Sequence, residues 1–271
     1  MNRRMLSARV QGCRAMGLLR QGVPQRGSLA TSSLAVLFVG LAGVVWLSSS
    51  TGASSAPTAS SSASRPHLTI HGPWRGSTLE LSVRNGRLKL RGLMPHRHQR
   101  GCRFRRHFLR GTCRLAGMSY VKLKMGPHGD FVRVTHRLGL PLRVYLGHGS
   151  DKFIGNGERD LCFPGGSRRN RCVGGGGNDR CVTGPRNSDC VGGPGSDYCK
   201  TSTGSDGCWG GPGNDICIMG PNHDGCHGES GNDHLYGGAS SDQLYGGRGH
   251  DYCNGQAGRG KSHTCEAGPR H

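Results

Sequence analysis

Between Leu146 and Asn254 the chain repeats a nine-residue unit twelve times, and this period constrains the fold more than any other feature. Units such as 174–182, 192–200 and 210–218 follow the pattern Gly-Gly-x-Gly-x-Asp-x-U-x, in which U is an apolar residue or Cys. A glycine-rich sequence with a fixed period predicts an ordered solenoid, in which each unit buries only one or two side chains. The apolar fraction of 33% fits such a fold better than a conventional close-packed core.

Each unit carries a polar slot two residues before U, and an aspartate fills it in ten of the twelve units. The slots are Asp151, Asp160, Asn170, Asp179, Ser188, Asp197, Asp206, Asp215, Asp224, Asp233, Asp242 and Asp251. One inserted residue between Cys162 and Cys172 is the only irregularity in the spacing of the U positions.

Over residues 146–258 this pattern resembles the RTX, or haemolysin-type, calcium-binding repeat family. The resemblance implies an all-β fold, namely a right-handed parallel β-roll (a β-helix or β-solenoid), in which two units complete one coil. Units 18 residues apart would then stack on each other, with Ca²⁺ between stacked turns, bound by Asp side chains and turn carbonyls. The chemistry agrees, because calcium takes oxygen ligands in flexible geometry and glycine permits the tight turns that direct carbonyls inward.

Alternate units place the slots on two edges of such a roll, and the two edges differ. We call the edge with Asp160, Asp179, Asp197, Asp215, Asp233 and Asp251 the first edge; most of its turn glycines are present. The second edge carries Asp151, Asn170, Ser188, Asp206, Asp224 and Asp242. Arg168, Arg169 and Arg186 occupy its turns, and Asp189 lies one place out of register.

We therefore expect calcium mainly on the first edge, at up to about five sites between its six turns, and few sites on the second. The alternative is that the aspartates only cap turns through side-chain hydrogen bonds. Stacked carboxylates without cations would repel one another, which favours calcium.

Nine of the twelve U positions are Cys, where the family usually has Leu, Ile or Phe. They could be small buried hydrophobes or could form disulfides. The disulfide candidates are Cys102, Cys113, Cys162, Cys172, Cys181, Cys190, Cys199, Cys208, Cys217, Cys226, Cys253 and Cys265. Pairing along a stack gives 162–181, 199–217, 172–190 and 208–226, and pairing across the core gives 162–172, 181–190, 199–208 and 217–226. Both remain open, with Cys102–Cys113 and Cys253–Cys265 as further pairs.

The N-terminal residues 1–47 are expected to be a signal peptide or an uncleaved signal anchor. Their apolar run, Leu34–Leu47, is shorter than the roughly 20 residues that span a bilayer. Met16 is an alternative start. A Ser/Ala-rich linker follows at 48–65, and the many cysteines favour an oxidising compartment. The sequence thus predicts a secreted or cell-surface protein, with a membrane contact only through an uncleaved N-terminal segment.

Residues 66–145 are predicted to form a basic β cap on the roll, and residues 259–271 a C-terminal tail. The cap segment has 17 Lys/Arg against Glu80 and Asp130, whereas residues 146–258 have 13 acids against nine Lys/Arg. Asn85-Gly86 between alternating strands predicts a hairpin, and 126–130 resembles a degenerate first repeat. We expect one core shared by cap and roll, because the open end of a solenoid would aggregate.

The basic stretch 97–110 has two readings: a contact surface for an anionic envelope polymer, or a solvated arginine-rich loop. Only two phenylalanines lie there, so we do not expect nucleic acid as a partner. No catalytic motif is present in the sequence, which predicts a non-enzymatic protein. The leading hypothesis is an exported calcium-binding β-roll that folds in extracellular calcium. The alternative is an adhesion or envelope-binding module that uses residues 66–145.

Overall fold

The computed structural model describes residues 65–72, 76–92, 100–105, 110–166, 168–257 and 261–266. These residues form 21 β-strands, which confirms the predicted all-β class. The predicted signal or anchor segment 1–47 and residues 48–64 of the predicted linker lie outside the described residues. Within the described residues no helix has the length and apolar character needed to cross a membrane.

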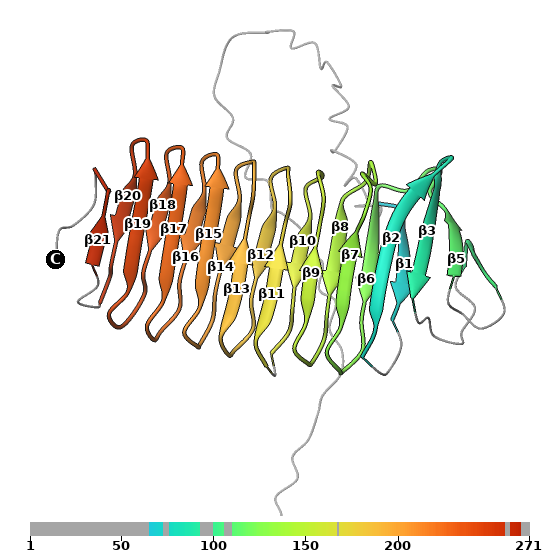
Figure 1. Ribbon diagram of the computed structural model, residues 1–271, viewed down its shortest axis with the longest axis horizontal. Coiled ribbons are helices and arrows are strands. Elements are labelled where there is room, and N and C mark those ends of the chain that lie inside the picture. The colour runs from blue at the N-terminus through green and yellow to red at the C-terminus, as the bar shows by residue number, and fades with distance from the viewer. Residues whose placement is uncertain are drawn as a thin grey trace, which may run out of the picture. The chain divides into compact units, whose positions relative to one another are not determined.

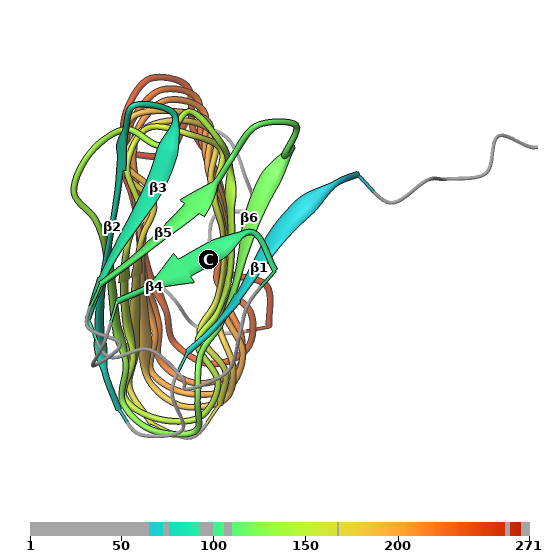
Figure 2. The same ribbon diagram turned by 90° about the vertical axis from the view of Figure 1, so that its right-hand side faces the viewer.

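The chain winds alternately through two sheets that face each other across a thin core (Figures 1 and 2). The nine-stranded sheet contains, in spatial order, β1 (His67–His71), β6 (Tyr120–Lys124), β8 (Leu142–Tyr145), β10 (Leu161–Phe163), β12 (Arg180–Val182), β14 (Tyr198–Lys200), β16 (Ile216–Ile218), β18 (His234–Tyr236) and β20 (Tyr252–Asn254). The twelve-stranded sheet contains β21 (Lys261–His263), β19 (Gln243–Arg248), β17 (Gly225–Ser230), β15 (Gly207–Pro212), β13 (Ser188–Val191), β11 (Asn170–Val173), β9 (Lys152–Ile154), β7 (Phe131–Val134), β2 (Thr78–Arg84), β3 (Arg87–Gly92), β5 (Arg110–Arg114) and β4 (Cys102–Phe104).

The strands of the roll are parallel and in register, so that every U residue stacks on another U residue. In the nine-stranded sheet Cys181 lies beside Cys199, which lies beside Cys217. This confirms the predicted stacking of units 18 residues apart. The inserted residue is absorbed between β10 and β11: Cys162 pairs with Cys181, 19 residues later, and the 18-residue step resumes afterwards.

The antiparallel strands β2, β3, β5 and β4 form the cap, and β3, β5 and β4 lie across the N-terminal end of the roll (Figure 2). The hairpin between β2 and β3 turns at Asn85 and Gly86, whose φ angles of 54° and 66° are those of the expected turn. Buried residues of the cap, such as Leu81, Leu88 and Leu90, belong to the same hydrophobic cluster as the U residues. The predicted shared core is confirmed.

The roll extends further in both directions than the sequence suggested. Four strands of the 66–145 segment, β1, β6, β7 and β8, are already parallel strands of the roll, so coiling begins well before Leu146. At the other end, β21 pairs with β19, within the residues expected to be a tail. Parallel pairing and a shared core continue the solenoid wherever the strand pattern persists, even where the glycine turns are lost.

Candidate calcium sites

The slot side chains lie where the turns enter the strands, and all twelve are buried. First-edge aspartates precede strands of the nine-stranded sheet, while second-edge residues precede or begin strands of the twelve-stranded sheet. A buried carboxylate is costly unless a charge or several hydrogen bonds compensate it. The partners of both carboxylate oxygens therefore decide whether a slot can hold a cation.

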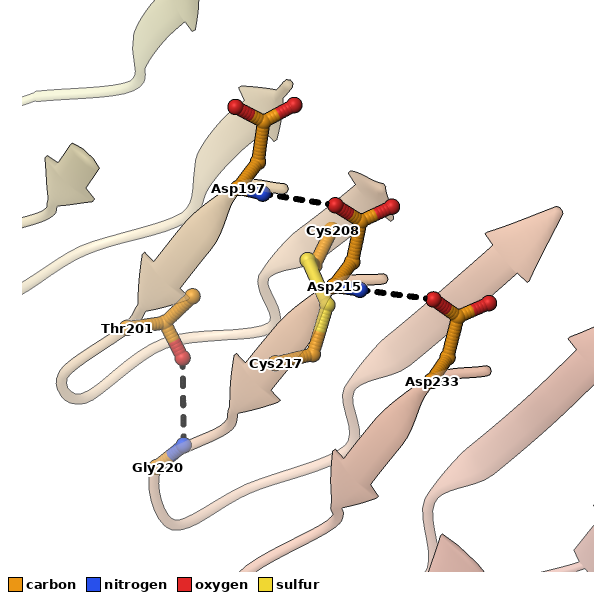
Figure 3. The surroundings of a disulfide bond; sticks show 7 residues. All are labelled: Asp197, Thr201, Cys208, Asp215, Cys217, Gly220 and Asp233. Atoms are coloured by element: carbon orange, nitrogen blue, oxygen red, sulfur yellow. Dashed lines mark hydrogen bonds between the residues drawn. A yellow bond between two sulfur atoms is a disulfide. The ribbon is translucent and has the colours of Figure 1, made fainter. Parts of the chain in front are cut away.

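One oxygen of each first-edge aspartate joins consecutive coils. The backbone amide of one slot residue donates to Oδ1 of the slot residue in the next coil (Figure 3). The distance is 2.6 Å from Asp179 N to Asp197 Oδ1, 2.7 Å from Asp197 N to Asp215 Oδ1 and 2.8 Å from Asp215 N to Asp233 Oδ1. The series runs without a break from the Leu142 amide, which donates to Asp160, to Asp251. We call it the aspartate ladder.

The second oxygen, Oδ2, is buried and has no hydrogen-bond partner in any of the six first-edge aspartates. It lies over the first glycine of its own turn: a Cβ on Gly174, Gly192 or Gly210 would collide with it. The turn thus leaves free space beside an unsatisfied, ionisable oxygen. This combination fits a hard cation with oxygen ligands, because turn carbonyls lie nearby and calcium tolerates irregular oxygen shells.

The second edge has the same arrangement only in two separate runs. The first passes from Asp130 through Asp151 to Asn170, and the second from Ser188 to Asp242. At Ser188 the ladder is interrupted, because the short hydroxyl donates to the Arg186 carbonyl (3.0 Å).

The aspartates of these two runs, Asp151, Asp206, Asp224 and Asp242, also have a buried Oδ2 without a partner. The space beside this oxygen is what differs between the edges. Where the first edge has glycine at the first turn position, four second-edge turns have buried side chains, at Leu146, Thr183, Thr201 and Met219. The turn of Asp242 is the exception, because it begins with Gly237, on which a Cβ would lie 2.8 Å from Asp242 Oδ2. The Thr201 hydroxyl accepts a hydrogen bond from the Gly220 amide at 3.1 Å (Figure 3).

The fourth position of each turn supports the same distinction. Every described first-edge turn with a positive φ at this position has glycine there, as at Gly195 and Gly213. On the second edge Gly149 and Gly204 are also glycine, but Arg186, Asn222 and Ser240 adopt positive φ angles, which cost energy for residues with a side chain. The Arg169 guanidinium pairs with Asp189 at 3.1 Å, so Asp189 takes no part in the ladder, as its register predicted.

Burial raises the pKa of the slot carboxyls from Asp151 to Asp242, because it disfavours the charged form. The pKa is about 7 for Asp160 and Asp215 and about 8 for Asp179, where neighbouring aspartates add to the effect of burial. On the second edge, burial raises the pKa of Asp151 and Asp206 to about 6. Without a cation, Asp160, Asp179 and Asp215 therefore resist ionisation near neutral pH.

Two residues that continue these rows of hydrogen bonds were missed by the slot pattern: Asp130 on the second edge and Glu266 at the end of the aspartate ladder. Asp130, noted only as part of a degenerate repeat, is buried, donates its amide to Asp151 Oδ1 at 2.8 Å, and accepts from the Ser77 amide and hydroxyl. At the other end, the Asp251 amide donates to Glu266 Oε2 at 2.7 Å. Glu266 follows Asp251 by 15 residues rather than 18 and lacks a glycine turn, so the repeat register could not have revealed it.

The U cysteines form one column of sulfur atoms between the sheets. Four disulfides are present: Cys102–Cys113, Cys162–Cys172, Cys208–Cys217 and Cys253–Cys265. Cys102–Cys113 and Cys253–Cys265 were predicted, and Cys162–Cys172 belongs to the predicted scheme of pairing across the core. Cys181, Cys190, Cys199 and Cys226 are free thiols, and burial raises the pKa of Cys199 to about 11.

Pairing along a stack is not found, and pairing across the core occurs only in part, with Cys208–Cys217 in neither predicted scheme. In-register neighbours in one sheet direct their side chains the same way, whereas residues of facing sheets point toward each other. The core is thin enough for this, with Cα–Cα separations of 6.3 Å for Cys162–Cys172 and 6.6 Å for Cys208–Cys217.

The fold and its turns define a class: a parallel β-roll whose turns enclose carboxylate oxygens suited to a metal ion. Two stretches, residues 191–220 and 227–260, match the family model of the RTX calcium-binding nonapeptide repeat in four copies. These stretches are therefore similar to RTX nonapeptides, which bind Ca²⁺. No curated protein and no solved structure gives a significant match to the chain.

Proposed function

We propose that this protein is an exported, non-enzymatic calcium-binding β-roll, and that calcium binding to the first edge drives its folding. The observation that carries the proposal is the unbroken row of buried aspartates, each with one unsatisfied oxygen beside a glycine. RTX repeat proteins are typically secreted, and the roll has the oxygen-rich turns expected of a calcium-binding structural protein.

The ligands would be the Oδ2 atoms of Asp160, Asp179, Asp197, Asp215, Asp233 and Asp251 together with carbonyls of the glycine turns. Calcium supplies the positive charge that allows these buried carboxyls to ionise. In the unfolded chain the aspartates are hydrated and scattered, so the ion binds the folded state preferentially, and its binding free energy becomes folding free energy. A chain in low cytosolic calcium would stay loose, and extracellular calcium would complete the fold.

Circular dichroism of the full chain during a calcium titration tests this proposal. We expect the β signal to develop with millimolar calcium and to disappear with a chelator, while magnesium has little effect because it demands a regular octahedral shell. A chain that is equally folded with and without calcium, and that takes up no calcium in calorimetry, would overturn the proposal.

The preference for the first edge is tested by isosteric substitutions. Asp215→Asn removes the charge of a first-edge slot, and Asp224→Asn does the same on the second edge, where the turn begins with Met219 rather than glycine. We expect Asp215→Asn to remove about one bound calcium and Asp224→Asn to leave the stoichiometry unchanged. Equal loss of calcium in both variants would disprove the one-sided arrangement.

A second candidate function is attachment to an anionic cell envelope through the basic 66–145 segment. It is favoured by the eight Lys/Arg residues that surround two adjoining hollows on the cap sheet, where Glu80 is the only acid. Retention of the protein on isolated cell wall, released by salt, would support this function. Retention that is indifferent to salt would contradict an electrostatic attachment.

A further inference from the structure

The outer face of the cap sheet carries three rows of side chains that cross β2, β3 and β5. In the first row Arg84 lies opposite Arg87, and Arg87 lies opposite Arg114. In the third row Arg91 lies between Glu80 and Arg110. The middle row contains Ser82, Lys89 and Thr112, with Arg103 of β4 beyond them. Buried leucines alternate with these residues along β2 and β3, so the rows face away from the core.

The cations of the first row oppose one another with no acid among them, whereas in the third row Glu80 lies opposite Arg91. Like charges directly opposite in a sheet destabilise it, and Arg87 has an arginine partner on both sides. The two ion pairs found among the described residues, Arg137–Glu158 and Arg169–Asp189, lie elsewhere. The face is hollowed into an open groove of about 940 Å³. A bound anion would remove the repulsion that the fold otherwise retains.

The chemistry of the rows narrows the class of ligand. Arginine outnumbers lysine, and its planar fork binds the oxygens of sulfate or phosphate groups through two hydrogen bonds at once. Hydroxyls of Ser82 and Thr112 between the arginine rows can pair with sugar hydroxyls. Bases would need aromatic platforms, but the three rows contain no aromatic residue. The ring of Phe104 packs over Gly111, which pairs with the buried Leu90 on the other face of the sheet.

We propose that this arginine face is a binding site for a polysaccharide that carries sulfate or phosphate esters. The proposal deepens the envelope-attachment function and rests on it, but it does not depend on where calcium binds. The two arginine rows lie four residues apart along the strands, or roughly 13 Å, and so contact charges on successive sugar units of one chain.

Heparin binding by the full chain in saturating calcium tests the proposal. The test variant is Arg87→Gln/Arg91→Gln, and the control is Arg171→Gln/Lys200→Gln, which removes the same charge from exposed strand positions of the roll. We expect the test variant to bind heparin at least about tenfold more weakly and the control to change by less than about twofold. Arg110→Gln/Arg114→Gln on β5 repeats the test if the first variant does not fold.

Three results would overturn the proposal: no heparin binding, equal weakening in the test and control variants, or tighter binding of single-stranded DNA through the same arginines. The calcium titration of the same variants is the independent readout. If calcium-dependent folding is normal while heparin binding fails, only the polysaccharide site is refuted. If retention on cell wall persists without Arg87 and Arg91, attachment uses another surface.

Discussion

The two oxygens of each ladder aspartate have different surroundings, and this division explains why the slot tolerates so little change. Oδ1 accepts a backbone amide of the preceding coil and holds the stack together. Asparagine can replace it in that respect, as Asn170 does for Asp151 at 2.8 Å. Oδ2 has no protein partner on either edge, so only a cation or a proton can satisfy it.

The glycine beneath Oδ2 provides a test at this scale. Gly192→Ala places a Cβ against Asp197 Oδ2 and within 2.6 Å of the Gly210 carbonyl, although its φ angle is an ordinary one. We expect it to weaken calcium binding and to lower the free energy of unfolding by about 1–3 kcal/mol in calcium. Urea unfolding followed by circular dichroism measures the loss.

Gly225→Ala is the matched control, because a Cβ there meets nothing within 4 Å. It should change the free energy of unfolding by no more than about 0.5 kcal/mol. If both alanine variants are equally stable and bind calcium equally, the space beside Oδ2 is not a cation site.

At the scale of strands and turns, the nine-residue period correctly predicted the arrangement of the core and the stacking of the units. Twelve units with U residues at a nine-residue spacing determine which side chain enters the core and which residues stack, because a slip of one residue would expose the U position. The Asn85-Gly86 hairpin followed from local turn chemistry alone. The predicted disulfide pairs were wrong where the distance between the facing sheets determines the pairing, as for Cys208–Cys217. The spacing of cysteines in the sequence does not show which sulfur atoms of the two sheets lie close together.

The C-terminal end of the roll, where Cys265 and Glu266 contact the last repeat, is the part of the structure that the sequence predicted least. Glu266 satisfies the amide of Asp251, and the adjacent Cys265 is bonded to Cys253 with a Cα–Cα separation of 5.8 Å. Neither residue belongs to a repeat. Their role depends on β21 pairing with β19, which is a tertiary contact rather than a local pattern.

Cys265→Ser should therefore release the last strand. Loss of a disulfide that spans 12 residues should cost about 2–3 kcal/mol, and β21 should become open to proteases. Limited proteolysis with mass spectrometry would locate the new cleavage near residue 261. Cys226→Ala, which removes a buried free thiol from the column, should leave the C-terminal cleavage unchanged. A Cys265→Ser protein as resistant as the unmodified chain would show that the disulfide does not hold this end.

For the whole molecule, the raised pKa values make stability depend on pH in opposite directions with and without calcium. In the calcium-free fold Asp160, Asp179 and Asp215 have pKa values of about 7 to 8, against roughly 3.9 for an unfolded aspartate. The folded state holds more protons between these values, so the contribution of these carboxyls to stability is fully present below about pH 4 and is lost as the pH rises through about 8.

Calcium requires ionised carboxylates, so its affinity should rise over the same interval. In chelator, the β signal measured by circular dichroism should be larger at pH 5 than at pH 8, while the stabilisation produced by calcium should grow with pH. A β signal in chelator that is independent of pH, or that rises with it, would show that the buried carboxyls are compensated in some other way.

The 18-residue step between hydrogen-bonded aspartates limits how such an array can change in length. The single extra residue before Cys172 is tolerated, because one turn absorbs it and the following strands keep their sheets. Deleting nine residues would move every downstream strand to the opposite sheet, so that first-edge aspartates would stack on second-edge slots. Duplication or loss of a complete coil leaves every later aspartate in its row. Natural variants of this array should therefore differ by whole coils, and the loss of an odd number of units would divide the first-edge row of aspartates between the two edges.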